Sequence, residues 1–147
     1  MEIDKINLKD TSLFSHLICD LISENKNIEE FISAFPSISN VEKTLHKNIN
    51  LSNRKVLSDV LISQYNNTVF NDIDNSLVFN NIKRLIDPNT HIVTTGHQLN
   101  IFASPLFLMY KITSIIATSI KLNEMFNQYS FIPCFWMATE DHDFEEI

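Results

Sequence analysis

The sequence predicts an α/β fold in which a helical N-terminal region, residues 1–89, precedes a strand–helix–strand unit, residues 90–147. Two observations predict it. In the first region apolar side chains recur three and four positions apart, which is the spacing of amphipathic helices. In the second, two β-rich runs flank a long apolar segment, which is the pattern of a βαβ unit.

Five helices are expected in the N-terminal region, separated by capping and stop signals and by a polar loop over residues 66–75. The signals are Thr11 or Ser12, Asn27 with Glu30, Pro36, Ser39 with Glu42, Ser52 and the closing turn Asp87-Pro88-Asn89. The region holds no cluster of reactive side chains. His16, His46 and Cys19 are isolated, and we interpret them as surface or packing residues.

In the second region, His91–Thr95 reads as a strand buried on both faces, and it runs into Gly96-His97-Gln98. A long helix then starts near Ser104-Pro105, and Phe131–Met137 is the second strand. The apolar stripe of the helix is expected to face the core, through Leu106, Met109, Tyr110, Ile112, Ile116, Ile120 and Met125. Strands joined by a crossover helix are parallel, so the polar clusters that follow them meet at one edge of the sheet, where α/β folds bind ligands.

Composition limits the partners. The chain has 147 residues, a formal net charge of -7 and a pI of about 5.1, and its basic residues are scattered, which argues against a nucleic-acid partner. The nearest basic cluster, Arg54-Lys55, is interpreted as a solvated helix face. We expect no membrane span, because polar residues interrupt the longest apolar run. Two distant cysteines and the lack of a signal pattern predict a cytoplasmic protein.

Thr94-Thr95-Gly96-His97 matches a short pattern that is similar to one in class I nucleotidylyltransferases and class I aminoacyl-tRNA synthetases. The glycine would allow positive φ or close approach of a ligand to the backbone. The histidine would donate hydrogen bonds to phosphate oxygens. Gln98 follows as a further contact, and Ser104 would cap the next helix, whose first N–H groups suit an anion. We therefore expect an adenine nucleotide, ATP or ADP, at this edge.

Four ionisable residues follow the second strand: Glu140, Asp141, His142 and Asp143. So dense a cluster at the edge of a parallel sheet suggests a catalytic group. It could form an acid–base pair, orient an amine or bind Mg²⁺, and the sequence does not separate these roles. A metal-dependent hydrolase that uses His97, His142, Asp141 and Asp143 is an alternative, although neither loop has the spacing of a known metal site.

Two long blocks, residues 93–102 and 133–147, together with Pro105-Leu106 and Tyr110-Lys111, resemble the N-terminal part of the bacillithiol synthase family in its Bacteroidetes version. The resemblance implies a Rossmann-like core and a ligase that joins the carboxyl group of L-cysteine to the amine of glucosaminyl malate. It also implies a C-terminal coiled coil, through which a homodimer could form, and which is absent from these residues.

The chain departs from the family pattern in two ways. Ala103-Ser104 stands where the family usually has Thr-Gly before the proline, which affects the expected anion site. The chain also ends directly after the second block, so we expect a fragment with an incomplete sheet. A non-enzyme alternative follows from this, namely an inactive truncated remnant or a helical interaction module.

Overall fold

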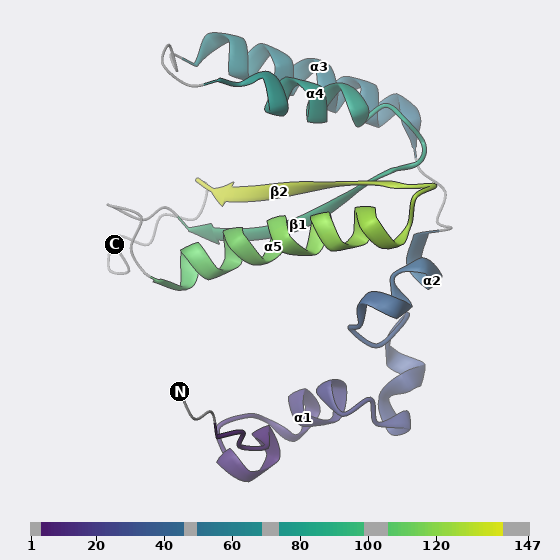
Figure 1. The fold of residues 1–147 in the computed structure, drawn as a ribbon, viewed down its shortest axis with the longest axis vertical. Coiled ribbons are helices and arrows are strands. Elements are labelled where there is room, and N and C mark those ends of the chain that lie inside the picture. The colour runs from purple at the N-terminus through teal and green to yellow at the C-terminus, as the bar shows by residue number, and fades with distance from the viewer. Residues whose placement is uncertain (1–3, 46–49, 69–73, 99–105, 140–147) are drawn as a thin grey trace. The chain divides into compact units, whose positions relative to one another are not determined.

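The computed structural model describes residues 4–45, 50–68, 74–98 and 106–139. The chain divides into two compact units, Met1–Asn48 and Ile49–Ile147. The predicted boundary at residue 90, where helical spacing gives way to a β-rich run, falls inside the second unit and stays a prediction. Figure 1 shows the elements of both units.

The N-terminal unit is built of short helical pieces. It contains α1 (His16–Ile22), α2 (Glu42–Leu45) and three 3-10 turns at Leu8–Thr11, Lys26–Phe31 and Ile38–Asn40. Local side chains cap three of them. Ser15, rather than Thr11 or Ser12, is the N-cap of α1, because its hydroxyl accepts from Ile18 N at 3.4 Å. The expected second helix is a 3-10 turn capped by Asn25, whose side chain accepts from Asn27 N at 3.1 Å.

The second unit begins with a helical pair, α3 (Leu51–Asn67) and α4 (Ser76–Arg84). Asn50 caps α3 by accepting from Asn53 N at 3.2 Å, where the sequence suggested Ser52. The buried Ser58 of α3 donates to the Ile82 carbonyl of α4 at 3.1 Å. The helices therefore pack through a hydrogen bond as well as through apolar contact.

A two-stranded parallel sheet forms the centre of the second unit. It pairs β1 (Thr90–Gln98) with β2 (Ser130–Ala138) in continuous register from Thr90↔Ser130 to Gln98↔Ala138. The predicted parallel pairing is confirmed. Both strands are longer than expected, and Gly96-His97-Gln98 continues β1 rather than forming a loop. The strand is not buried on both faces, because Ile92 and Thr94 are exposed.

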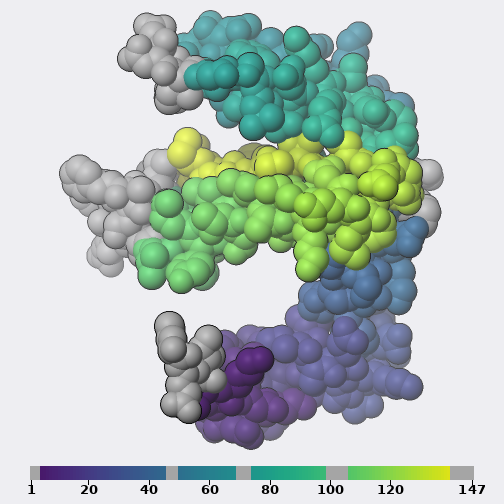
Figure 2. Space-filling view, in the orientation of Figure 1, coloured from purple at the N-terminus to yellow at the C-terminus, as the bar shows by residue number. Residues whose placement is uncertain are grey.

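The crossover helix α5 (Leu106–Met125) contacts both strands, and Figure 2 shows its outer side, in green, as part of the molecular surface. Its buried face is not the predicted stripe. The face against the strands carries Ile115, Ser119 and Leu122, and Phe126 is buried just after the end of the helix. Six members of the predicted stripe are exposed instead: Leu106, Met109, Tyr110, Ile116, Ile120 and Met125. The helix is apolar nearly all round, so helical spacing alone could not select the inner face.

Asn123 joins the end of α5 to the start of β2. Its side-chain amide donates to the Phe131 carbonyl at 2.8 Å and accepts from Phe131 N at 2.9 Å. The same amide donates to the Ser119 carbonyl at 2.8 Å. One side chain thus pairs with backbone groups of β2 that have no neighbouring strand among the described residues. It also fixes the position of α5 along the strand direction.

Among the described residues, no helix combines the length and apolar character that crossing a bilayer requires.

Arg54 corrects a sequence interpretation. It does not lie on a solvated face. It is half-buried, and Nη1 donates to the Leu85 carbonyl at 3.2 Å and to the Thr90 carbonyl. Both acceptor residues are buried. Arg54 therefore links α3 to the end of α4 and the start of β1.

We predict that Arg54→Met lowers the free energy of unfolding by about 2–3 kcal/mol, because two buried carbonyls lose a charged donor. Lys55→Met is the matched control, since Lys55 is the exposed neighbour on the same helix, and it should stay within about 0.5 kcal/mol of the wild type. Urea denaturation of the complete gene product measures both. Equal losses in the two variants would contradict the assigned role.

Candidate functional site

The C-terminal ends of β1 and β2 form the candidate site. The register sets Gly96 beside Trp136, His97 beside Met137 and Gln98 beside Ala138. Four of the predicted nucleotide-contacting residues, Thr94, Gly96, His97 and Gln98, therefore lie along the last five positions of one strand. This agrees with the general tendency of open α/β sheets to bind ligands at this edge.

Gly96 lies in extended strand and does not adopt positive φ, so that part of the expectation is wrong. A Cβ atom at this position would lie 3.1 Å from the Trp136 carbonyl oxygen and 3.3 Å from Trp136 Cβ. A larger residue here would thus be unusually close to β2, and Trp136 would have to shift by a few tenths of an ångström. The space that its missing side chain leaves is taken up by Trp136, and contact of Gly96 with a nucleotide remains a prediction.

His97 is half-buried near the end of β1. Its Nδ1 lies 3.1 Å from the Gln98 carbonyl oxygen. A carbonyl can only accept, so this contact favours the proton on Nδ1 and leaves Nε2 as the acceptor of the neutral ring. The imidazole also meets the Phe107 ring edge-on, with centroids 6.1 Å apart. His97 is therefore anchored to both β1 and α5, which limits the directions its ring can take.

Lys111 is a site residue that sequence reasoning missed. It extends from α5 to donate from Nζ to the Gly96 carbonyl oxygen at 2.9 Å, and Nζ lies 4.6 Å from the centroid of the Phe107 ring. A signal was present, since Lys111 is the one charged residue between positions 106 and 120. A cation in such an apolar stretch needs a polar partner, but only the fold shows which partner it has.

Thr94 is exposed, but its side chain also contacts β2. Its hydroxyl shares a hydrogen bond with the Cys134 side chain, which is its register partner. Burial raises the pKa of the Cys134 thiol, and the Thr94 hydrogen bond opposes that rise only partly. The thiol is therefore protonated at neutral pH and is a poor nucleophile, which agrees with a packing role.

The other predicted site residues lie outside the described residues. They are Ser104, Glu140, Asp141, His142 and Asp143. Their assignments stay predictions. Within the described residues, no three His, Cys, Asp or Glu side chains gather closely enough to hold a metal ion.

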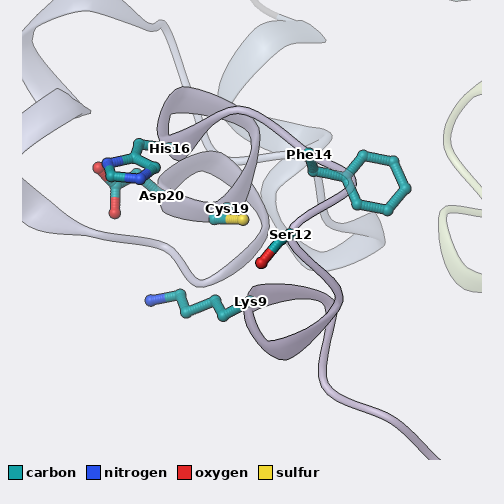
Figure 3. Close-up of a pocket in the computed structure, with 6 residues that line it drawn as sticks. All are labelled: Lys9, Ser12, Phe14, His16, Cys19 and Asp20. Carbon is teal, nitrogen blue, oxygen red and sulfur yellow. The ribbon is translucent and has the colours of Figure 1, made fainter.

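A surface hollow of about 380 Å³ lies in the N-terminal unit (Figure 3). It contains none of the predicted site residues. Its lining is Lys9, Ser12, Phe14, His16, Cys19 and Asp20. Most of these side chains are exposed, and His16 projects from a helix of only seven residues. The chemistry of the strand ends, with an anchored imidazole beside an ammonium group, makes them the better candidate.

Comparison with known proteins identifies the family. Residues 1–147 match the family model described as "Bacillithiol biosynthesis BshC, N-terminal Rossmann-like domain". The chain belongs to this family. Its fold is therefore Rossmann-like, with an incomplete sheet of two parallel strands among the described residues.

Curated relatives agree with this assignment, and each bears the name "Putative cysteine ligase BshC". The protein of Flavobacterium psychrophilum is 40% identical over all of this chain and 28% of its own length. That of Christiangramia forsetii is 41% identical over 97% of this chain and 26% of its own length. That of Cytophaga hutchinsonii is 34% identical over 99% of this chain and 27% of its own length. The chain thus spans little more than a quarter of the length of these relatives.

We predict that Gly96→Ala lowers the free energy of unfolding by about 1–3 kcal/mol, since the new methyl group presses on the backbone of β2. Thr94→Ala, an exposed position two residues earlier on β1, should cost less. Chemical denaturation of the complete gene product compares the two variants. A Gly96→Ala protein as stable as the wild type would show that β2 yields at Trp136.

Proposed function

We propose that this chain is the nucleotide-binding N-terminal part of a ligase of bacillithiol biosynthesis that joins L-cysteine to glucosaminyl malate. The observation that carries the proposal is the family match over the whole chain, together with relatives named as cysteine ligases. The reaction forms an amide from the cysteine carboxyl group and the glucosamine amine, and it removes the elements of water.

The strand ends support an adenine nucleotide as the activating group. A phosphate is an anion, and two of the described donors near the C-terminal end of β1, His97 and Lys111, suit it. ATP would transfer a phosphoryl or an adenylyl group to the cysteine carboxylate and release ADP or pyrophosphate. The amine would then displace phosphate or AMP from the activated carboxyl group. His97 would donate to phosphate oxygens once its ring is protonated or turned, and Gln98 would contribute an amide donor.

The acidic cluster after β2 would serve the amine. Glu140, Asp141, His142 and Asp143 follow the strand that pairs with β1. One of these groups would take the proton that the attacking amine loses, and its neighbours would orient the amine. Mg²⁺ is a further partner for these carboxylates if a nucleotide binds, since the ion prefers oxygen ligands shared with phosphate.

We predict that the complete gene product converts L-cysteine and glucosaminyl malate to their amide, and that His97→Ala slows this conversion by at least about tenfold. Mass spectrometry detects the product, with and without ATP. His16→Ala is the matched control, because His16 is an exposed histidine of the N-terminal unit, and it should leave the rate unchanged. Absence of the amide under all conditions would overturn the proposed function.

We also predict that ADP at a hundred times its Kd raises the stability of the protein by about 2.7 kcal/mol. Thermal denaturation reports this as a higher Tm. The increase should shrink in His97→Ala and persist in His16→Ala. If ADP leaves the Tm of the wild type unchanged while the amide still forms, the ligase function stands and the proposed nucleotide site is wrong.

A further inference from the structure

Lys111 is a half-buried cation at the C-terminal edge of the sheet. Its ammonium group lies 2.9 Å from the carbonyl oxygen of Gly96 and 4.6 Å from the centroid of the Phe107 ring. The ring of His97 meets the same Phe107 ring, with centroids 6.1 Å apart. Two side chains that can carry positive charge thus contact one aromatic ring, one from β1 and one from α5.

The partners that the structure describes for Lys111 do not balance its charge. An ammonium group has three N–H donors, and the Gly96 carbonyl takes one. The Phe107 ring offers a weak electrostatic attraction. Among the described residues, no carboxylate pairs with Lys111. Partial burial of an unpaired charge is costly, and a neutral donor could hold the carbonyl at lower cost. The charge is therefore explained better by an anion than by the backbone bond alone.

We propose that Lys111 binds an anionic oxygen of the substrate at the end of β1, beside His97. This rests on the proposed function, because the ligand is one of its substrates. Apart from the reacting carboxylate of L-cysteine, the suitable oxygens are the phosphates of the nucleotide and the carboxylates of the malate group. An ammonium group recognises either as a point charge. Lys111 would reach this ligand from α5 without any change in the strands.

A purely structural role is the competing explanation. In that case Lys111 only holds the first turns of α5 against β1, and its loss would weaken the binding of every ligand to the same extent. Anion binding predicts a selective loss, confined to ligands that carry the charged group. Adenosine and ADP make a suitable pair, because they differ in the diphosphate.

The test measures binding of ADP, adenosine and L-malate to the complete gene product by titration calorimetry. Lys111→Met should weaken the binding of ADP, or of L-malate, by about ten- to a hundredfold. The affinity for adenosine should stay within about twofold of the wild-type value. Lys111→Arg, which keeps the charge, should lose much less. Lys121→Met is the matched control, an exposed lysine of the same helix, and should bind like the wild type.

The selective loss identifies the source of the anion. It is the nucleotide if ADP binds more weakly, and the malate group if L-malate binds more weakly. The inference is overturned if Lys111→Met weakens the binding of ADP and adenosine equally, or weakens the binding of neither ADP nor L-malate. It is also overturned if the wild-type protein binds neither ADP nor L-malate. Lys111→Gln serves if Lys111→Met does not unfold cooperatively, because it retains a donor without charge. Amide formation that is equally fast in wild type and Lys111→Met would refute the role of Lys111 while the ligase function stands.

Discussion

The parallel pairing of β1 with β2 is the constraint on which the rest of the second unit depends. Nine residues of each strand are in register. Parallel strands require a long crossover, and α5 supplies it. Because both strands run the same way, their C-terminal ends meet at one edge, and Gly96, His97 and Gln98 come to lie beside the last residues of β2. Every argument about the site follows from this pairing.

Two polar side chains fasten the crossover helix to the sheet, one near each end. Asn123 bonds both backbone groups of Phe131 at the start of β2, and Lys111 bonds the carbonyl of Gly96 near the end of β1. Between them the contact is mostly apolar, through Ile115 and Leu122, with the small side chain of Ser119 on the same face. Apolar packing is not directional, whereas these hydrogen bonds are, so the polar pair sets the register of α5. The same anchoring holds Phe107 against His97.

Much of this arrangement could be predicted from the sequence. The β-rich runs and the apolar segment between them identified the strands, the crossover and their parallel direction. The strand ends were longer than expected, because Gly96-His97-Gln98 has no strong β propensity and is held in the strand by pairing with β2. The helix caps shifted by up to a few residues, since Ser, Thr and Asn occur so often here that several could serve.

The sequence could not predict the role of a residue whose contact partner lies far away in the chain. Arg54 looked like a surface residue because nothing near it in the sequence shows the carbonyls of Leu85 and Thr90. Gly96 suggested backbone freedom, but its neighbour Trp136 lies 40 positions away in the chain. The buried side of α5 was chosen wrongly because the helix is apolar on most sides.

The sequence by itself determined the class of fold and the family, because periodicity and local motifs are properties of neighbouring residues. Only the tertiary structure decided which face of α5 is buried, that Gly96 packs closely against Trp136 and that Lys111 reaches the end of β1. These features are contacts between residues that are 15 or more positions apart, and they exist only once the strands have paired and α5 has packed against them.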